Sequence, residues 1–228
     1  MFSILYLISF NCILHGQVLQ NSIWSENIKT VTLYKNNIDQ EAPIITLNKD
    51  DRLMLRFDEI AEQPNNYRYR IIHCNSTWQP DSLEPYEYIQ GPEEGYIENY
   101  NSSFTTLTSY FNYYQSIPAN YSAFTLSGNY ILEVFLDDNP DSTIITRQFY
   151  VTENLLDVEI EVTSPIENRW SNQEVNVTID CNHPSHSHLL NSIYLKVVVK
   201  QNGRIDNIRV LPFSGHSNNK LCYRWTRE

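Results

Sequence analysis

The chain has 228 residues, which is enough for one large domain or two small ones with a sizeable core. Hydrophobic residues make up 41% of the chain and charged residues 19%, proportions that exclude both a disordered chain and a bundle of membrane helices. The formal net charge is −11, and lysine and arginine are scattered without a run, so we do not expect a surface that binds nucleic acid.

The N-terminal segment Met1–Leu14 carries no charge and consists mainly of Ile, Leu and Phe. Its length fits the apolar region of a signal peptide and is too short for a membrane span of about 20 residues. Gly16 is the small residue expected before a cleavage site, so we predict a signal peptide over 1–16 and an exported protein. The residue before Cys12 is a bulky, polar asparagine, and we therefore expect no lipid anchor. Three cysteines remain after the leader, and their number and separations predict neither a disulfide framework nor a zinc site.

Alternation of apolar and polar residues dominates the rest of the chain, in runs rich in Val, Ile, Thr, Tyr and Phe. The predicted strands are Ile28–Tyr34, Arg52–Phe57, Tyr67–Cys74, Tyr130–Leu136, Ile144–Val151, Val158–Thr163, Val175–Ile179, Ile193–Val199 and a last one around Leu221–Trp225. The stretch Val158–Val162 is the clearest case, with apolar residues on one side while Glu159 and Glu161 face water. Asn202-Gly203 predicts a hairpin that leads to a strand starting near Ile205. Helical periodicity is missing beyond a turn or two, so we predict an all-β fold.

Strands at short intervals predict sandwiches of two sheets packed through their apolar faces. A boundary near Thr152–Leu156 divides the chain into an immunoglobulin-like β-sandwich domain over 25–152 and a second β-sandwich domain over 155–228. The second domain has only four or five predicted strands, and an open sheet cut there exposes unpaired edges. We therefore expect it to be incomplete and the chain to be part of a longer protein.

The segment Asn75–Tyr121 departs from this alternation because it is long, contains proline and is crowded with aromatic residues. So many rings are not expected to stay unburied. We predict an ordered excursion that contains some short strands.

Two long motifs and several short ones follow one another in a fixed order. The first is Tyr67–Asn75, followed by Trp78 and Pro80, and the second is Leu126–Leu132, followed by Arg147–Val151. The residues of these motifs are Tyr67, Tyr69, His73, Cys74, Asn75, Trp78, Pro80, Tyr100, Ser103, Ser127, Gly128, Asn129, Tyr130, Arg147 and Phe149. Their order resembles the plug proteins of the bacterial type IX secretion system, with looser similarity in the second domain. The resemblance implies that these residues are structural or partner-facing.

The resemblance implies a non-enzymatic protein of the periplasm, associated with the outer membrane through the giant translocon barrel, whose periplasmic mouth it closes. It also implies no cofactor and no small-molecule substrate. Such a contact needs roughly 1,000 Å² or more with aromatic anchors. We expect the segment Trp78–Tyr114 to provide it, with Tyr86, Tyr96 and Tyr110 as anchors.

Two groups of residues suggest chemistry at first sight. His73 and Cys74 are adjacent, but neighbours on a strand point to opposite faces and cannot form a catalytic pair. We therefore expect Cys74 to be a small buried residue and His73 to contact a nearby loop. The segment His183–His188 has spacing that suits weak metal binding, but no carboxylate or cysteine completes a ligand set, so we predict no metal site. Phosphate-binding loops, nucleophile elbows and zinc motifs are missing from the sequence, and we predict no catalysis.

Two other functions fit the same composition. One is a secreted carbohydrate-binding sandwich with exposed Tyr and Trp that stack on sugar rings. The other is an immunoglobulin-like adhesin or cell-surface scaffold.

Overall fold

The computed structural model describes residues 20–35, 41–164, 173–181, 187–188, 191, 193, 195–200, 208–218 and 220–226. These residues form two compact units that divide between Thr152 and Glu153. The predicted signal peptide over 1–16 lies outside the described residues. Within the described part of the chain, no helix has the length and apolar character needed to cross a membrane.

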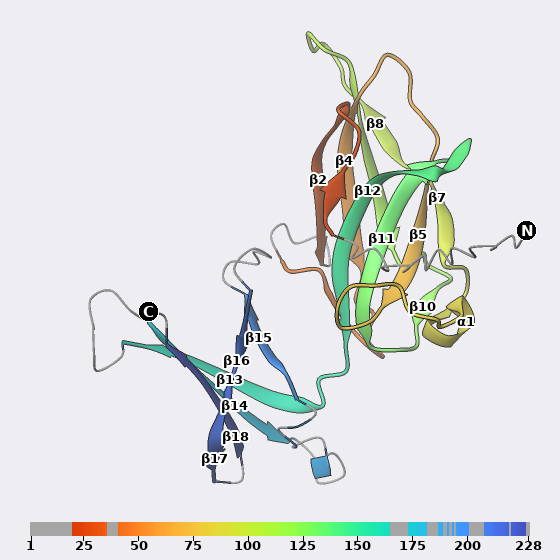
Figure 1. Cartoon of the computed structure of the whole chain (residues 1–228). Helices are drawn as coiled ribbons and strands as arrows, with labels where there is room; N and C mark the ends of the chain where they lie inside the picture. The colour runs from red at the N-terminus through yellow and green to blue at the C-terminus, as the bar shows by residue number, and fades with distance from the viewer. Residues whose placement is uncertain are drawn as a thin grey trace, which may run out of the picture. The chain divides into compact units, whose positions relative to one another are not determined.

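The first unit contains two main sheets (Figure 1). The β5 sheet consists of β1 (Ser22–Ile23), β3 (Ile44–Thr46), β5 (Tyr67–Cys74), β7 (Glu94–Ile97), β11 (Gly128–Leu136) and β12 (Asn139–Thr152). Its order is β1-β12-β11-β5-β7, and β3 pairs in parallel with the same edge of β12 as β1. The β4 sheet consists of β2 (Ile28–Lys35), β4 (Leu53–Ile60), β8 (Tyr100–Ser102) and β9 (Tyr110–Ile117), in the order β2-β4-β9-β8. At one end of this unit lie α1 (Pro85–Tyr88) and the pair β6 (Ile89–Gln90) and β10 (Ala123–Phe124).

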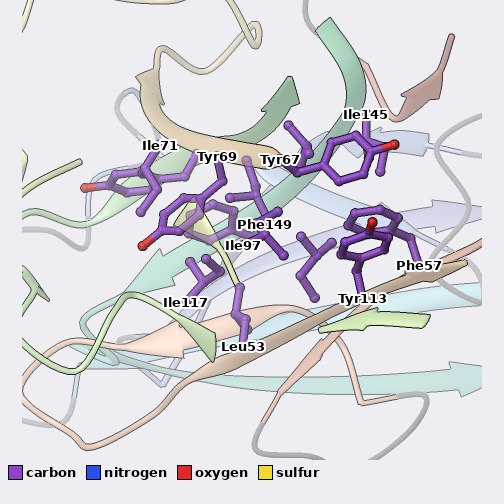
Figure 2. Close-up of a cluster of buried hydrophobic side chains, with 14 of the residues drawn as sticks. Leu53, Phe57, Tyr67, Tyr69, Ile71, Ile97, Tyr113, Ile117, Ile145 and Phe149 are labelled. Carbon is purple, nitrogen blue, oxygen red and sulfur yellow. The ribbon is translucent and has the colours of Figure 1, made fainter. Parts of the chain in front are cut away.

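The core of the first unit lies between these two sheets, and the alternation of the sequence explains its composition. Along β4, Leu53, Leu55 and Phe57 are buried while the residues between them are half-buried or exposed. The ring of Phe57 stacks on Tyr113 at 5.0 Å and meets the edge of Tyr67 at 5.3 Å (Figure 2). Burial of each such large side chain stabilises the fold by about 1.5–3 kcal/mol.

A buried carboxylate also connects the two sheets. Glu59 on β4 accepts hydrogen bonds from the hydroxyls of Tyr67 on β5, at 2.7 Å, and Tyr113 on β9, at 3.1 Å. The amide of Asn65 donates a third hydrogen bond to the same carboxylate. A buried charge requires such partners, because an unsatisfied carboxylate inside the core is strongly destabilising.

The second unit also contains two sheets. The β14 sheet consists of β13 (Leu156–Thr163), β14 (Glu174–Cys181), β17 (Phe213–Ser217) and β18 (Lys220–Thr226), in the order β13-β14-β18-β17. The other is the antiparallel pair β15 (Val197–Lys200) and β16 (Ile208–Leu211). Residues of both sheets form one small core: Val175, Val177, Ile179, Val197, Leu211, Leu221 and Tyr223.

The prediction of an all-β sandwich fold is confirmed, and β5 has the predicted bounds. The aromatic excursion is ordered and contains short strands, but it also contains β9, an eight-residue strand inside the β4 sheet that we had not predicted as a regular strand. The strand predicted from Ile193 begins only at Val197. Its predicted hairpin partner is β16, and the connection over 201–207 lies outside the described residues.

The alternating strand β13 shows a departure from the expected burial. Glu159 and Glu161 are exposed, as predicted. The apolar row of Val158, Ile160 and Val162 is exposed as well, at 57%, 58% and 58%. The alternation therefore gives the two faces correctly, but the apolar face of this strand stays more than half exposed.

Candidate partner-binding surface

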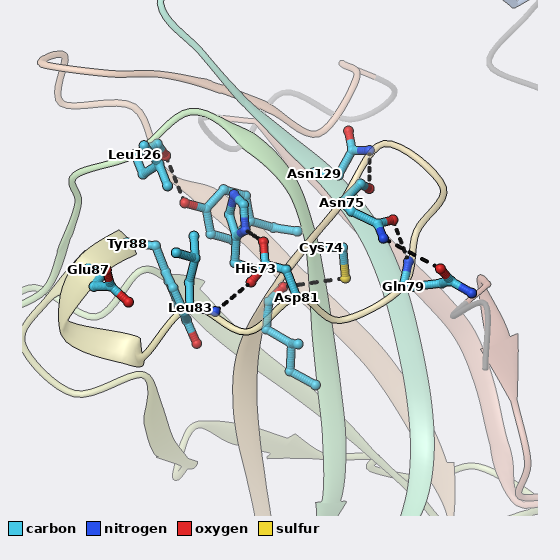
Figure 3. Close-up of polar contacts among 12 residues, drawn as sticks. His73, Cys74, Asn75, Gln79, Asp81, Leu83, Glu87, Tyr88, Leu126 and Asn129 are labelled. Carbon is cyan, nitrogen blue, oxygen red and sulfur yellow. Dashed lines mark hydrogen bonds and ion pairs between the residues drawn. The ribbon is translucent and has the colours of Figure 1, made fainter. Parts of the chain in front are cut away.

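The first motif surrounds the end of β5, where the chain enters the loop that precedes α1 (Figure 3). His73 is buried, its Nδ1 is hydrogen-bonded to the Asp81 carboxylate, and its ring lies 5.7 Å from Tyr88 and 4.8 Å from Tyr130. His73 therefore contacts a nearby loop, as the sequence predicts. Cys74 is buried, and burial raises the pKa of its thiol to about 12, so it stays protonated and weakly nucleophilic.

Asn75 shapes the turn that follows. Its side-chain oxygen accepts hydrogen bonds from the backbone N–H groups of Thr77, at 2.9 Å, and Gln79, at 3.1 Å. Asparagine is suited to such a turn because its short amide can replace a backbone acceptor. The turn brings Pro80 back to pair with Cys74, and it places the Trp78 ring against Tyr150 at 5.3 Å.

The second motif begins β11 and supports the first. The amide of Asn129 donates to the Asn75 carbonyl at 3.0 Å, and the Tyr130 hydroxyl donates to the Leu126 carbonyl at 2.7 Å. This last bond resembles the tyrosine corner of immunoglobulin-type sandwiches. Gly128 faces His73 so closely that a Cβ there would collide with Nε2 of the imidazole.

The remaining motif residues also contact the fold itself. Tyr67, Tyr69 and Phe149 are buried in the core, and Ser127 is half-buried at the start of β11. Arg147 on β12 donates to the carbonyls of Ser22, at 3.1 Å, and Val31, at 3.4 Å, and burial lowers the pKa of its guanidinium. Ser103 accepts a hydrogen bond from the Tyr110 N–H at 2.9 Å, and Tyr100 packs on Phe111.

The aromatic residues of the excursion divide into two groups. Tyr88, Phe111 and Tyr113 belong to the core. The three predicted anchors are exposed: Tyr86 by 79%, Tyr96 by 53% and Tyr110 by 37%. The expectation that the rings of this segment are buried is therefore correct for only part of them, and the exposed ones are available to a partner.

A groove of about 380 Å³ opens between the two sheets beside β7 and β9. We call it the tyrosine groove; it is lined by Met54, Tyr69, Tyr96, Glu98, Asn99, Tyr114, Gln115, Ser116, Ala119, Asn120 and Tyr121. Its walls combine exposed aromatic rings with amide side chains and one carboxylate. Such a lining suits a ligand with apolar faces and many hydrogen-bonding groups.

Two features position the rings of the tyrosine groove. The ring of Tyr69 packs directly against the backbone of Gly95. A Cβ at residue 95 would lie only 2.7 Å from the phenol oxygen, so this position requires glycine if the Tyr69 ring is to keep its place. Burial, with a smaller effect of Tyr121, raises the pKa of the Tyr69 phenol to about 12. The guanidinium of Arg68 lies 5.0 Å above the Tyr96 ring and is bonded to Glu94 at 3.0 Å, which holds this wall in place.

The sequence identified only part of this groove. Tyr96 and Tyr114 lie in the segment predicted to meet a partner. Tyr69 was predicted only as a structural or partner-facing motif residue, and Met54 of β4 was not predicted at any binding position. The strand pairings that bring these segments together are long-range, and no local signal in the sequence reports them.

Only some of the residues considered for chemistry are among the described residues. No cluster of three or more His, Cys, Asp or Glu side chains there has the geometry to hold a metal ion. His183 and His186 of the histidine segment lie outside the described residues, and His188 is exposed.

Comparison with known proteins identifies the family. The sequence model of the type 9 secretion system plug protein 1st domain matches residues 28–153, more than half of the chain. A crystal structure of a hypothetical protein from Parabacteroides merdae is similar with a TM-score of 0.81 and 28% identity, over 91% of this chain and 52% of that chain. The chain thus spans about half the length of that protein, and no curated protein matches it. The chain belongs to the type 9 secretion system plug protein family.

Proposed function

We propose that the chain is the N-terminal part of a non-enzymatic, exported component of the type IX secretion system. It acts in the periplasm, where it docks on the outer-membrane translocon barrel and closes its periplasmic mouth. The observation that carries this proposal is the match of the first unit to the plug family over residues 28–153.

The structure of the first unit suits a stopper. Its core contains large, closely packed rings, and its loops are tied to strands by hydrogen bonds such as that between Asn129 and Asn75. A rigid sandwich loses little conformational entropy on docking, which favours a tight seal. The exposed rings of Tyr86, Tyr96 and Tyr110 supply the aromatic anchors that such interfaces use.

The test is a binding measurement between the chain and the purified translocon barrel in detergent. Each of the variants Tyr86→Ala, Tyr96→Ala and Tyr110→Ala removes one exposed ring. A ring that serves as an anchor contributes about 1–2 kcal/mol or more, so at least one variant should bind about tenfold more weakly.

The matched control is Trp24→Ala. Trp24 is an exposed ring that follows β1, at the opposite edge of the β5 sheet from Tyr96. Its loss should leave the affinity unchanged. Unchanged affinity in all three tyrosine variants would assign these rings no role in docking, and failure of the unmodified chain to bind the barrel would refute the proposed function.

The tyrosine groove favours a second candidate function, binding of carbohydrate. Its rings of Tyr96, Tyr114 and Tyr121 can stack on sugar faces, and its amides can bond sugar hydroxyls. A glycan array separates the two candidates, because a translocon plug should bind no sugar. Binding that is lost in Tyr114→Ala and Tyr121→Ala but kept in Trp24→Ala would support the second candidate.

A further inference from the structure

The two units share the same strand topology as far as β9 in the first unit and β18 in the second. With the short strands β1, β3 and β6 set aside, β2, β4, β5, β7, β8 and β9 of the first unit correspond in chain order to β13, β14, β15, β16, β17 and β18 of the second. The orders β2-β4-β9-β8 and β13-β14-β18-β17 are the same, and β5 pairs with β7 as β15 pairs with β16. Both follow the strand order of an immunoglobulin-type sandwich. The first unit then continues with the hairpin β11–β12, which pairs with β5.

The hairpin β11–β12 covers part of the core of the first unit. Tyr130, Leu132 and Phe149 of this hairpin belong to the same buried cluster as Ile28 of β2. Arg147 of β12 also bonds the Val31 carbonyl of β2 at 3.4 Å. Ile28 is only 3% exposed. The first strand and the last hairpin of this sandwich therefore share one core.

In the described part of the second unit, no hairpin of this kind packs against the corresponding strand, β13. Val158, Ile160 and Val162 of β13 lie opposite Ile179, Val177 and Val175 of β14 in the strand pairing, and so belong to the same face. The β14 residues are buried under β15 and β16, whereas the three β13 residues stay more than half exposed. Among the described residues β15 pairs only with β16, whereas β5 pairs both with β7 and with β11.

Edge-to-edge pairing of β13 with a second copy of the chain is disfavoured. The opposite face of β13 carries Asp157, Glu159 and Glu161, all exposed. Their neighbours on β14 are Asp180, Thr178 and Asn176, none of which is a cation. Antiparallel pairing of two β13 strands would set carboxylates directly opposite each other, which is destabilising.

We propose that the apolar row of β13 is a docking surface for a β-hairpin equivalent to β11–β12, supplied by the same polypeptide beyond residue 228. The first strand of this hairpin pairs with β15 on the edge opposite β16, and the second lies across Val158, Ile160 and Val162. The similar protein from Parabacteroides merdae is about twice as long as this chain, which leaves room for such a segment. This proposal is independent of the translocon role.

The experiment compares the 228-residue chain with the longer polypeptide encoded by the same gene, by hydrogen exchange and mass spectrometry. In the shorter chain, amides of β13 and β15 should exchange many-fold faster than those of β2 and β5. In the longer polypeptide, their exchange should slow by tenfold or more. Equal exchange in the two forms, or a reading frame that stops at residue 228, would overturn the proposal.

A pair of variants tests the docking face itself. Ile160→Lys places a charge in the apolar row, and Glu159→Lys places the same charge on the opposite face as a control. Ile160→Lys should lower the melting temperature of the second unit by several degrees in the longer polypeptide and leave it unchanged in the shorter chain. A loss already present in the shorter chain, or a dimer of that chain that Ile160→Lys dissociates, would assign the row to another occupant.

Discussion

The phenol oxygen of Tyr67 lies 2.7 Å from Oε1 of Glu59, and this hydrogen bond joins the two sheets of the first unit. Tyr67 lies on β5 and Glu59 on β4, so the bond crosses the core. A buried carboxylate without hydrogen-bond donors is strongly destabilising, and each donor to Glu59 is therefore important for the packing of the sheets.

Replacement of Tyr67 by Phe should destabilise the first unit by about 1.5–3 kcal/mol, because the buried carboxylate loses one of its donors. The same substitution at exposed Tyr86 removes a hydroxyl that faces water and should have an effect within about 0.5 kcal/mol. Urea unfolding followed by tyrosine and tryptophan fluorescence measures both values. Equal effects at the two positions would contradict the structural role of the bond.

Alkaline pH should destabilise the first unit. Burial raises the pKa of Tyr69 and of Tyr88 to about 12, and it raises the pKa of Tyr67 further, with the help of Glu59. The folded state therefore holds protons that the unfolded state releases near pH 10, so stability falls as pH rises above that value.

Unfolding free energies measured from about pH 8 to pH 11 check this expectation. The variant Tyr69→Phe removes one of the titrating phenols and should show a shallower fall. A stability that does not change over this range would show that the phenols ionise without unfolding.

Replacement of Gly128 by Ala should destabilise the first unit by about 1–3 kcal/mol, because the new methyl group meets the His73 imidazole. A double-mutant cycle with His73→Ala identifies the cause. If the collision is responsible, the cost of Gly128→Ala should be smaller once the imidazole is gone. Additive effects would instead point to the backbone at residue 128.

Cys74 should resist alkylation in the native protein. Its burial and raised pKa leave almost no thiolate at neutral pH, whereas Cys222 is half-buried. Treatment with iodoacetamide followed by peptide mass spectrometry should modify Cys222 first and Cys74 only after unfolding. Rapid modification of Cys74 in the folded chain would show that the end of β5 opens readily.

The sequence predicts correctly those strands in which apolar residues lie mainly on one face. In β5 every second side chain points into the core, and its bounds were predicted without error. In β9 the rings of Tyr110, Phe111, Tyr113 and Tyr114 fall on both faces and hide the period of two. That strand is regular because it pairs with β4, an interaction that local sequence does not report.

Burial and the groove depend on the same long-range information. The sequence gives the two faces of β13, but whether a face is covered depends on another sheet. The tyrosine groove likewise requires Tyr69, Tyr114 and Tyr121 to be brought together from three parts of the chain. The motif residues were recognisable as a set, and the structure shows that most of them support turns and core packing.

The outer edge of β12 is occupied by two short strands from the beginning of the chain, β1 and β3. Together they pair with only a few of its 14 residues. Removal of β1 and β3 would leave the backbone N–H and C=O groups along this edge of β12 unpaired. Strands from other copies of the protein could then pair with this edge and form aggregates. The strands β1 and β3 thus limit the length of β12 that another copy could pair with.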